Sequence, residues 1–137
     1  MSVRKAELND FDRIDSFDIF AGQRREDIKR GECFVAVENE EIVGYIVFNH
    51  SFFLMPFIQF LCVDPKFRRK GFAGKLLDYV EKACNDEKLF TSTESDNLTM
   101  LKVFSKRGYR VSGVIENIQE KSEIVFCKKM REVTKDE

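Results

Sequence analysis

The segment from Phe57 to Gly74, FIQFLCVDPKFRRKGFAG, constrains the fold of this chain more than any other stretch. Its first part is apolar enough for a strand, and Asp64 followed by Pro65 ends that strand. A basic turn with two glycines then leads directly into a helical pattern. Amide groups at the start of a helix have no intrahelical partner and carry partial positive charge. The segment therefore predicts a phosphate-binding turn in an α/β domain.

The residues of this turn suit a polyanion. Gly71 and Gly74 let the backbone approach a ligand without an intervening Cβ. Arg68, Arg69 and Lys70 add formal positive charge. Together with the helix start, they predict that the turn holds a phosphate compound.

Two common nucleotide-binding motifs do not match the turn. A nucleoside-triphosphate loop needs a glycine five residues before its Gly-Lys pair and a hydroxyl residue after it. Those positions hold Arg69 and Leu76. A dinucleotide fingerprint needs G-x-G-x-x-G, which the run from Gly71 to Gly74 does not supply. A domain for another nucleotide is therefore the least favoured interpretation.

The length and net charge of the chain limit the class of protein that it can belong to. With 137 residues we expect a single domain over residues 1–130, followed by a charged tail over 131–137. The formal net charge of −1 lacks the basic excess typical of nucleic-acid binding. No apolar run reaches the ~18 residues of a membrane helix, and the charged amino terminus lacks a signal-peptide core. We therefore expect a cytoplasmic protein without nucleic-acid or membrane partners.

The four cysteines are widely spaced and include no C-x-x-C pair, and the chain has one histidine, His50. A metal site needs clustered ligands, so we expect reduced, buried thiols and no metal.

Hydrophobic periodicity predicts alternating strands and helices. The predicted strands cover residues 3–6, 33–37, 42–48, a segment within 52–63 with a break around Met55–Pro56, 89–93, 109–115 and 123–129. The predicted helices are one capped by Asn9 or Asp10 with Phe11, Ile14 and Phe17 on one face, and others over 24–30, 73–84 and 97–106.

This element order predicts the pairing of the strands. Strands joined by hairpins pair antiparallel, whereas the crossover through the long helix joins 57–63 to 89–93 in parallel. The expected fold is α/β (α+β), with a mixed, mostly antiparallel sheet of about six to seven strands and helices on both faces.

The turn also matches the pattern R-x-x-G-x-A at Arg68, Gly71 and Ala73. With the preceding strand and Pro65, it resembles the acetyl-CoA-binding segment of the GNAT N-acetyltransferase superfamily. A later segment from Asn97 resembles that family's N-x-x-A-x-x-L-Y-x-x-x-G-F. It departs from that pattern in four residues: Met100, Val103, Phe104 and Tyr109. The resemblance covers nearly the whole chain and implies a GNAT-like fold.

The resemblance implies that acetyl-CoA is the co-substrate. Backbone amides of the turn would hold the pyrophosphate, the preceding strand would pair with the pantetheine, and Asn97 would reach the pantetheine or cap its own helix. The implied cofactor-binding residues are Leu61, Cys62, Val63, Arg68, Arg69, Lys70, Gly71, Phe72, Ala73, Gly74, Lys75 and Asn97.

The catalytic residues are less complete than in the family pattern. Members often place a glutamate on the strand before the turn, where this chain has Gln59, which orients a water but is no base. Glu94, beyond the next strand, is the nearest carboxylate, and Asp96 follows it. Phe104 stands in place of the usual tyrosine acid, so the thiolate would leave without that proton donor.

These residues indicate an enzyme that transfers an acetyl group from acetyl-CoA to a primary amine by direct attack in a ternary complex. A non-catalytic acyl-CoA-binding or regulatory module is the alternative, because the usual glutamate and tyrosine are missing. The amine partner is left open between a small amine, a peptide amino terminus, a lysine side chain and an aminoglycoside. Whether the chain forms a homodimer is also open.

Overall fold

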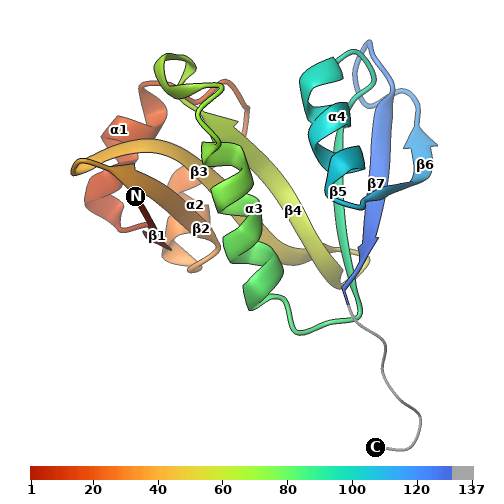
Figure 1. Cartoon of the computed structure of the whole chain (residues 1–137), viewed down its shortest axis with the longest axis horizontal. Helices are drawn as coiled ribbons and strands as arrows, with labels where there is room; N and C mark the ends of the chain where they lie inside the picture. The colour runs from red at the N-terminus through yellow and green to blue at the C-terminus, as the bar shows by residue number, and fades with distance from the viewer. Residues whose placement is uncertain (131–137) are drawn as a thin grey trace, which may run out of the picture. The chain divides into compact units, whose positions relative to one another are not determined.

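Seven strands form one sheet in the order β1-β2-β3-β4-β5-β7-β6 in this computed structural model, which describes residues 1–130 (Figure 1). The charged tail predicted over residues 131–137 lies outside the described residues. The strands are β1 (Ser2–Lys5), β2 (Cys33–Glu38), β3 (Glu41–Phe52), β4 (Met55–Val63), β5 (Lys88–Glu94), β6 (Arg110–Ile115) and β7 (Glu123–Lys129). The helices are α1 (Phe11–Asp15), α2 (Arg24–Lys29), α3 (Phe72–Ala83) and α4 (Leu98–Lys106), with 3-10 turns η1 (Leu8–Asp10) and η2 (Pro65–Phe67).

The predicted sheet is confirmed in type. β1 with β2, β2 with β3, β5 with β7, and β6 with β7 are antiparallel, whereas β4 and β5 are parallel. The parallel ladder joins Phe57 to Phe90 and Ile58 to Thr91, and the Thr91 hydroxyl donates to the Ile58 carbonyl at 3.0 Å. The last strand, β7, lies between β5 and β6, so the final hairpin folds back into the sheet.

Packing contacts divide the chain into two compact units. The N-terminal unit comprises residues 1–49 and 59–83, and the C-terminal unit comprises residues 50–58 together with the chain from 84 onward. The division cuts through β3 and β4, and the expectation of a single domain over residues 1–130 stays a prediction.

The core of the N-terminal unit lies on both faces of its strands. On one face, Ile14 of α1 and Ile28 of α2 pack with apolar residues of β2 and β3. On the other face, α3 buries Leu76, Leu77 and Val80 completely, as its apolar stripe predicts. Figure 1 shows α3 in front of the sheet and α1 and α2 behind it.

The first predicted helix is shorter than its apolar spacing suggests. Helix α1 ends at Asp15, and Phe17 lies beyond it although its ring is buried. The Asp10 carboxylate does not cap α1. It accepts hydrogen bonds from the Glu7 amide at 2.7 Å and from Arg4 at 2.8 and 3.1 Å, because the 3-10 turn before the helix takes up this side chain.

The break predicted around Met55–Pro56 lies in the wrong place. Strand β3 continues to Phe52, and the chain reverses at Phe53 and Leu54, whose φ angles are 51° and 65°. Pro56 lies inside β4, one residue after its start, where a missing N–H is tolerated. Phe53 and Leu54 do not indicate a turn in the sequence, because turns are usually predicted from glycine, asparagine or aspartate. The turn predicted after β2, by contrast, is confirmed and reverses at Asn39 and Glu40.

In the C-terminal unit, α4 packs on β7 through Phe104, whose ring centroid lies 5.4 Å from that of Phe126. Asn97 precedes α4, and Gly108 follows it with a φ of 88°, as expected for a left-handed helix end.

Candidate functional site

The predicted phosphate-binding turn starts from a fixed carboxylate. Asp64 lies directly before η2, and its side chain accepts hydrogen bonds from the Lys66 amide at 3.0 Å and the Arg13 guanidinium at 2.7 Å. Burial raises the pKa of Asp64, but these two hydrogen bonds outweigh it, so the pKa lies below its usual value. An ionised Asp64 therefore ties the end of β4 to α1.

Two residues of the turn itself adopt a left-handed backbone conformation. Arg69 and Gly71 have φ angles of 65° and 84°. A Cβ built on Gly71 would meet no atom within 4 Å, so the positive φ, and not crowding, selects glycine. The surface in front of Gly71 is therefore open. Arg68, Arg69 and Lys70 are exposed around it.

The turn leads directly into the first turn of α3. The Lys75 amide makes the first helical bond, to the Gly71 carbonyl at 3.1 Å. The amides of the first turn of a helix have no intrahelical partner, so an anion is stabilised there. Phe72 is buried and its ring lies 6.2 Å from that of Phe67, so its side chain anchors the turn and leaves only its backbone for a ligand.

The strand before the turn carries the predicted pantetheine-binding residues. Cys62 is buried, and its thiol lies 3.8 Å from the Phe17 carbonyl. Burial raises the pKa of Cys62, which disfavours the thiolate that a nucleophile needs. Leu61 and Val63 are half-buried. Cys62 thus belongs to the core, and only its backbone suits a ligand.

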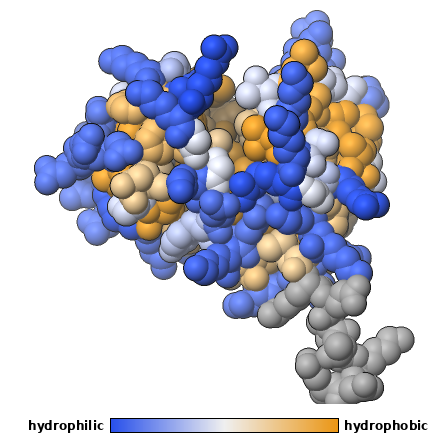
Figure 2. Space-filling model, viewed as in Figure 1, coloured by the Kyte–Doolittle hydropathy of each residue, from blue (hydrophilic) through white to orange (hydrophobic). Residues whose placement is uncertain are grey.

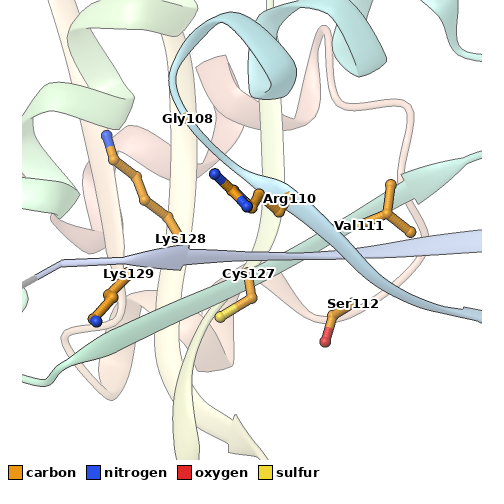
Figure 3. A pocket seen from close by; sticks show the side chains of 7 residues that line it. All are labelled: Gly108, Arg110, Val111, Ser112, Cys127, Lys128 and Lys129. Carbon is orange, nitrogen blue, oxygen red and sulfur yellow. The ribbon is translucent and has the colours of Figure 1, made fainter.

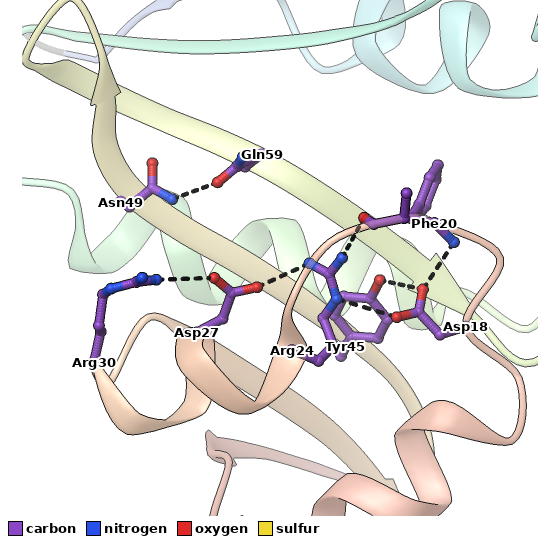
Figure 4. Close-up of polar contacts among 9 residues, drawn as sticks. Asp18, Phe20, Arg24, Asp27, Arg30, Tyr45, Asn49 and Gln59 are labelled. Carbon is purple, nitrogen blue, oxygen red and sulfur yellow. Dashed lines mark hydrogen bonds and ion pairs between the residues drawn. The ribbon is translucent and has the colours of Figure 1, made fainter.

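The predicted site residue Gln59 has an unforeseen partner. Asn49 of β3 is buried and donates a hydrogen bond from Nδ2 to Oε1 of Gln59 at 2.8 Å (Figure 4). Gln59 is exposed. Sequence reasoning does not find Asn49, because its contact depends on the register between β3 and β4.

Figure 4 also shows a buried ionic cluster in the N-terminal unit. The side chain of Arg24, 2% exposed, lies 3.1 Å from Asp18 and 2.9 Å from Asp27 and stacks 3.9 Å above the Phe60 ring. Burial raises the pKa of Asp27, although Arg24 opposes this. This cluster binds the segment between α1 and α2 to the sheet, which the sequence does not reveal.

Asn97 and Phe104 both have structural roles in the C-terminal unit. Asn97 caps α4, since its side-chain oxygen accepts from the Met100 amide at 3.2 Å. Phe104 is 2% exposed and packs against Tyr109, with ring centroids 5.3 Å apart. The cap is one of the two roles considered for Asn97, and a contact of either residue with coenzyme A stays a prediction.

The carboxylates at the end of β5 form an unexpected pair. Glu94 is exposed and lies directly opposite Glu123 of β7. The Glu123 side chain is half-buried and accepts a hydrogen bond from the Ser92 hydroxyl at 2.7 Å. From the sequence, Glu123 is only the start of a strand, because the pairing of β5 with β7 cannot be read from spacing.

Two open hollows in the C-terminal unit contain none of the predicted site residues. One, of about 410 Å³, lies on β6 and β7, and Figure 3 shows Arg110, Cys127 and Lys128 among its lining residues. The other, of about 570 Å³, is lined by residues of α4 and β6, including Leu98 and Val111. Figure 2 shows apolar side chains gathered over this part of the molecule. Neither hollow is therefore the candidate site.

Within residues 1–130, no group of three or more His, Cys, Asp and Glu side chains is placed to hold a metal ion, and none of the four cysteines is in a disulfide. No helix in that range is long and apolar enough to cross a membrane.

The predicted residues of β4 and the turn thus come together in the N-terminal unit, whereas Glu94, Asn97 and Phe104 belong to the C-terminal unit. The mixed seven-strand sheet, with the basic glycine turn between β4 and α3, is a GNAT-like acetyltransferase fold. The model of the acetyltransferase (GNAT) family matches residues 3–109, and the chain belongs to this family.

Three known proteins illustrate the similarity. A GNAT-family acetyltransferase from Bacillus cereus ATCC 10987 has 34% identity and a TM-score of 0.85, over 93% of this chain and 96% of that chain. Ard1 from Thermoplasma volcanium has a TM-score of 0.83 at 18% identity, over 96% and 98% of the two chains, and this likeness shows the fold alone. N-alpha-acetyltransferase 30 of Xenopus laevis is 35% identical over 86 residues, which make up 56% of this chain and 31% of that protein.

Proposed function

We propose that this GNAT acetyltransferase transfers an acetyl group from acetyl-CoA to a primary amine by direct attack within a ternary complex. The observation that carries the proposal is the turn from Arg68 to Gly74. Its positive φ at Gly71, its exposed cations and the start of α3 together suit a pyrophosphate. Acetyl-CoA is the phosphate compound that the family uses.

The turn would hold the pyrophosphate through its backbone amides, with Arg68 and Arg69 adding charge from the side. The β4 backbone from Leu61 to Val63 would pair with the pantetheine. Direct attack by the amine is favoured because Cys62, buried and with a raised pKa, is a poor acyl carrier.

An α-amino group is the acceptor that we propose first. The support is the relationship to a Xenopus protein named as an N-alpha-acetyltransferase, at 35% identity over 86 residues. The matched segment spans only 31% of that relative, so a direct assay has to decide between an α-amino group and the other amines.

A non-catalytic acyl-CoA-binding module is the second candidate, and two residues favour it. Phe104 has no hydroxyl and is buried in the core, and Gln59 has no carboxylate. This module would bind acetyl-CoA with the same turn but release no thiol.

Two measurements test the proposal. Calorimetric titration with acetyl-CoA should show binding to the wild type, and a thiol-release assay with peptides, free lysine, small amines and aminoglycosides should show turnover. Binding without thiol release for any amine would favour the second candidate. No binding of acetyl-CoA would refute both.

A further inference from the structure

The outermost strand of the C-terminal unit has an open edge. β6 is the last strand in the sheet order, and β7 is its only strand partner among the described residues (Figure 1). No strand within residues 1–130 pairs with the backbone on the other side of β6. An open edge of this kind is a template for pairing with another strand.

β6 lacks most of the features that protect an edge strand. The sheet's other edge strand, β1, has only four residues and carries Arg4 and Lys5. Short length and charged side chains both discourage pairing with another chain. β6 has six residues, contains neither lysine nor proline, and has Arg110 as its only charged residue. Its bulge at Ser112 is the one protective feature.

Two valines of β6 are exposed on the same face of the sheet. Val111 and Val114 are 62% and 53% exposed. Val111 lies opposite Phe126, and Val114 lies opposite Ile124. Phe126 and Ile124 are two residues apart on β7, so they and the two valines share one face. The bulge between the valines therefore places both of them side by side along the edge.

The valine face continues into an apolar groove beside α4. Phe126 packs on Phe104 of α4, so this face is the one that α4 covers. Leu98, the first residue of α4, is 67% exposed and lines the same hollow of about 570 Å³ as Val111. Single exposed apolar residues are common, whereas a group of them beside an open strand edge indicates an interaction surface.

The charges on the two sides of β6 differ in sign. Residues 102–110, which lead into the strand, carry four cations and no carboxylate. Residues 116–123, which follow it, carry three carboxylates and one cation. Two copies that pair antiparallel bring the basic side of one against the acidic side of the other, whereas parallel pairing would bring like charges together. This complementarity favours a second copy of the chain as the partner.

We propose that β6 pairs antiparallel with β6 of a second copy of this chain, about a two-fold axis between Ser112 and Gly113. Val111 of each copy then lies opposite Val114 of the other. Both open edges gain backbone hydrogen bonds, and the exposed aliphatic side chains beside α4 become buried. Because one edge pairs with itself, the assembly closes after two copies and forms a dimer.

The first test compares three variants by sedimentation equilibrium over a range of micromolar concentrations. The wild type should have twice the mass of one chain. Val111→Glu and Val114→Lys each place an unpaired charge in the apolar contact, so we expect the Kd of the dimer to rise by more than about 10-fold. Leu8→Glu is the matched control. Leu8 is 49% exposed but belongs to the N-terminal unit, so its replacement should leave the dimer intact.

The second test mixes the two β6 variants. In the proposed register the carboxylate of the Val111→Glu copy faces the ammonium of the Val114→Lys copy, and the other contact keeps both valines. We expect an equimolar mixture to form the dimer that neither variant forms alone at the same concentration. Circular dichroism checks that each variant keeps its secondary structure, because both side chains lie on the surface of a single copy.

A wild type that remains a single chain at every concentration would overturn the proposal and leave the β6 edge for an extended segment of a different protein. A dimer that persists in both Val111→Glu and Val114→Lys would place the interface elsewhere and overturn it as well. A mixture of the two variants that stays monomeric would overturn the antiparallel pairing of Val111 with Val114.

Discussion

Asn49 of β3 donates a hydrogen bond to the side-chain oxygen of Gln59 on β4 at 2.8 Å. Asn49 is buried and Gln59 is exposed, so this hydrogen bond fixes the side-chain amide of Gln59 at the surface. Gln59 stands where related enzymes often carry a glutamate. Asn49 Nδ2 would donate equally well to a carboxylate at this position.

This relationship predicts the effect of Gln59→Glu. The new carboxylate would keep the hydrogen bond from Asn49, which becomes stronger when its acceptor is charged. We expect the fold to be retained and the rate of thiol release to rise near neutral pH, because a proton acceptor becomes available at position 59. A pH–rate profile measures this, and Asn49→Leu combined with Gln59→Glu is the control. An unchanged profile would show that Gln59 lies outside the reacting centre.

The glycine turn predicts the effect of Gly71→Glu. A glutamate there places bulk and negative charge where phosphates should lie, so we expect acetyl-CoA binding to be lost in a folded protein. Gly71→Ala is the matched control. Its Cβ meets no atom within 4 Å, and only the positive φ of 84° opposes it. Such a left-handed conformation costs a residue with a Cβ about 1–2 kcal/mol. Calorimetry on both variants decides, and unchanged affinity in Gly71→Glu would remove the basis of the proposed function.

Much of this fold follows from the sequence because its signals are local. The apolar stripe of α3, the asparagine cap of α4 and the glycine turn each rest on a few neighbouring residues. The turn at Phe53 and Leu54 could not be predicted because bulky apolar residues rarely adopt positive φ. Glu123 and Asn49 could not be predicted for another reason. Their partners lie on neighbouring strands, and spacing along the chain does not give the register between strands.

Two substitutions of Phe104 should have different effects, one on the stability of the fold and the other on the rate of acetyl transfer. The ring is 2% exposed and packs between Tyr109 and Phe126. Emptying this space with Phe104→Ala should therefore cost about 3–5 kcal/mol of unfolding free energy. Phe104→Tyr should leave acetyl-CoA affinity nearly unchanged, and it should raise the rate if thiolate departure limits turnover.

The pH dependence of the wild type tests the same residue. Its rate should rise with pH without a falling limb near pH 10, since residue 104 has no phenol to lose a proton. A pH–rate profile of the wild type and Phe104→Tyr measures this. A fall above about pH 9 in folded protein would point to another acid, with Tyr109 the nearest phenol.

Asp64 predicts a loss of stability in acid. Its pKa in the folded protein lies below the reference value of 3.8. Stability from its ionised form is therefore fully present above that value and is lost as the pH falls through the folded pKa. We expect Asp64→Asn to be less stable than the wild type at neutral pH and to lose less stability on acidification. Urea unfolding from pH 7 to about pH 3 measures both slopes, and parallel slopes would contradict the assignment.

Replacing Arg24 should destabilise the protein, and the loss should be larger at neutral pH than in acid. Arg24→Met removes the buried cation that pairs with both Asp18 and Asp27, and breaking a buried ion pair typically costs about 3–5 kcal/mol. Burial already raises the pKa of Asp27, so its contribution to stability is present in acid and is lost as the pH rises through the folded pKa. Removing Arg24 should raise that pKa further, and the difference from the wild type should be smaller at pH 4 than at pH 7.

The matched control for this prediction is Arg30→Met. Arg30 also pairs with Asp27, at 3.4 Å, but its side chain is 57% exposed. Because exposed pairs are screened by water, we expect a loss below about 1 kcal/mol. Urea unfolding of both variants at the two pH values gives the comparison. Equal losses from Arg24→Met at pH 4 and pH 7 would mean that packing on the Phe60 ring, and not the buried charges, accounts for the contribution of Arg24.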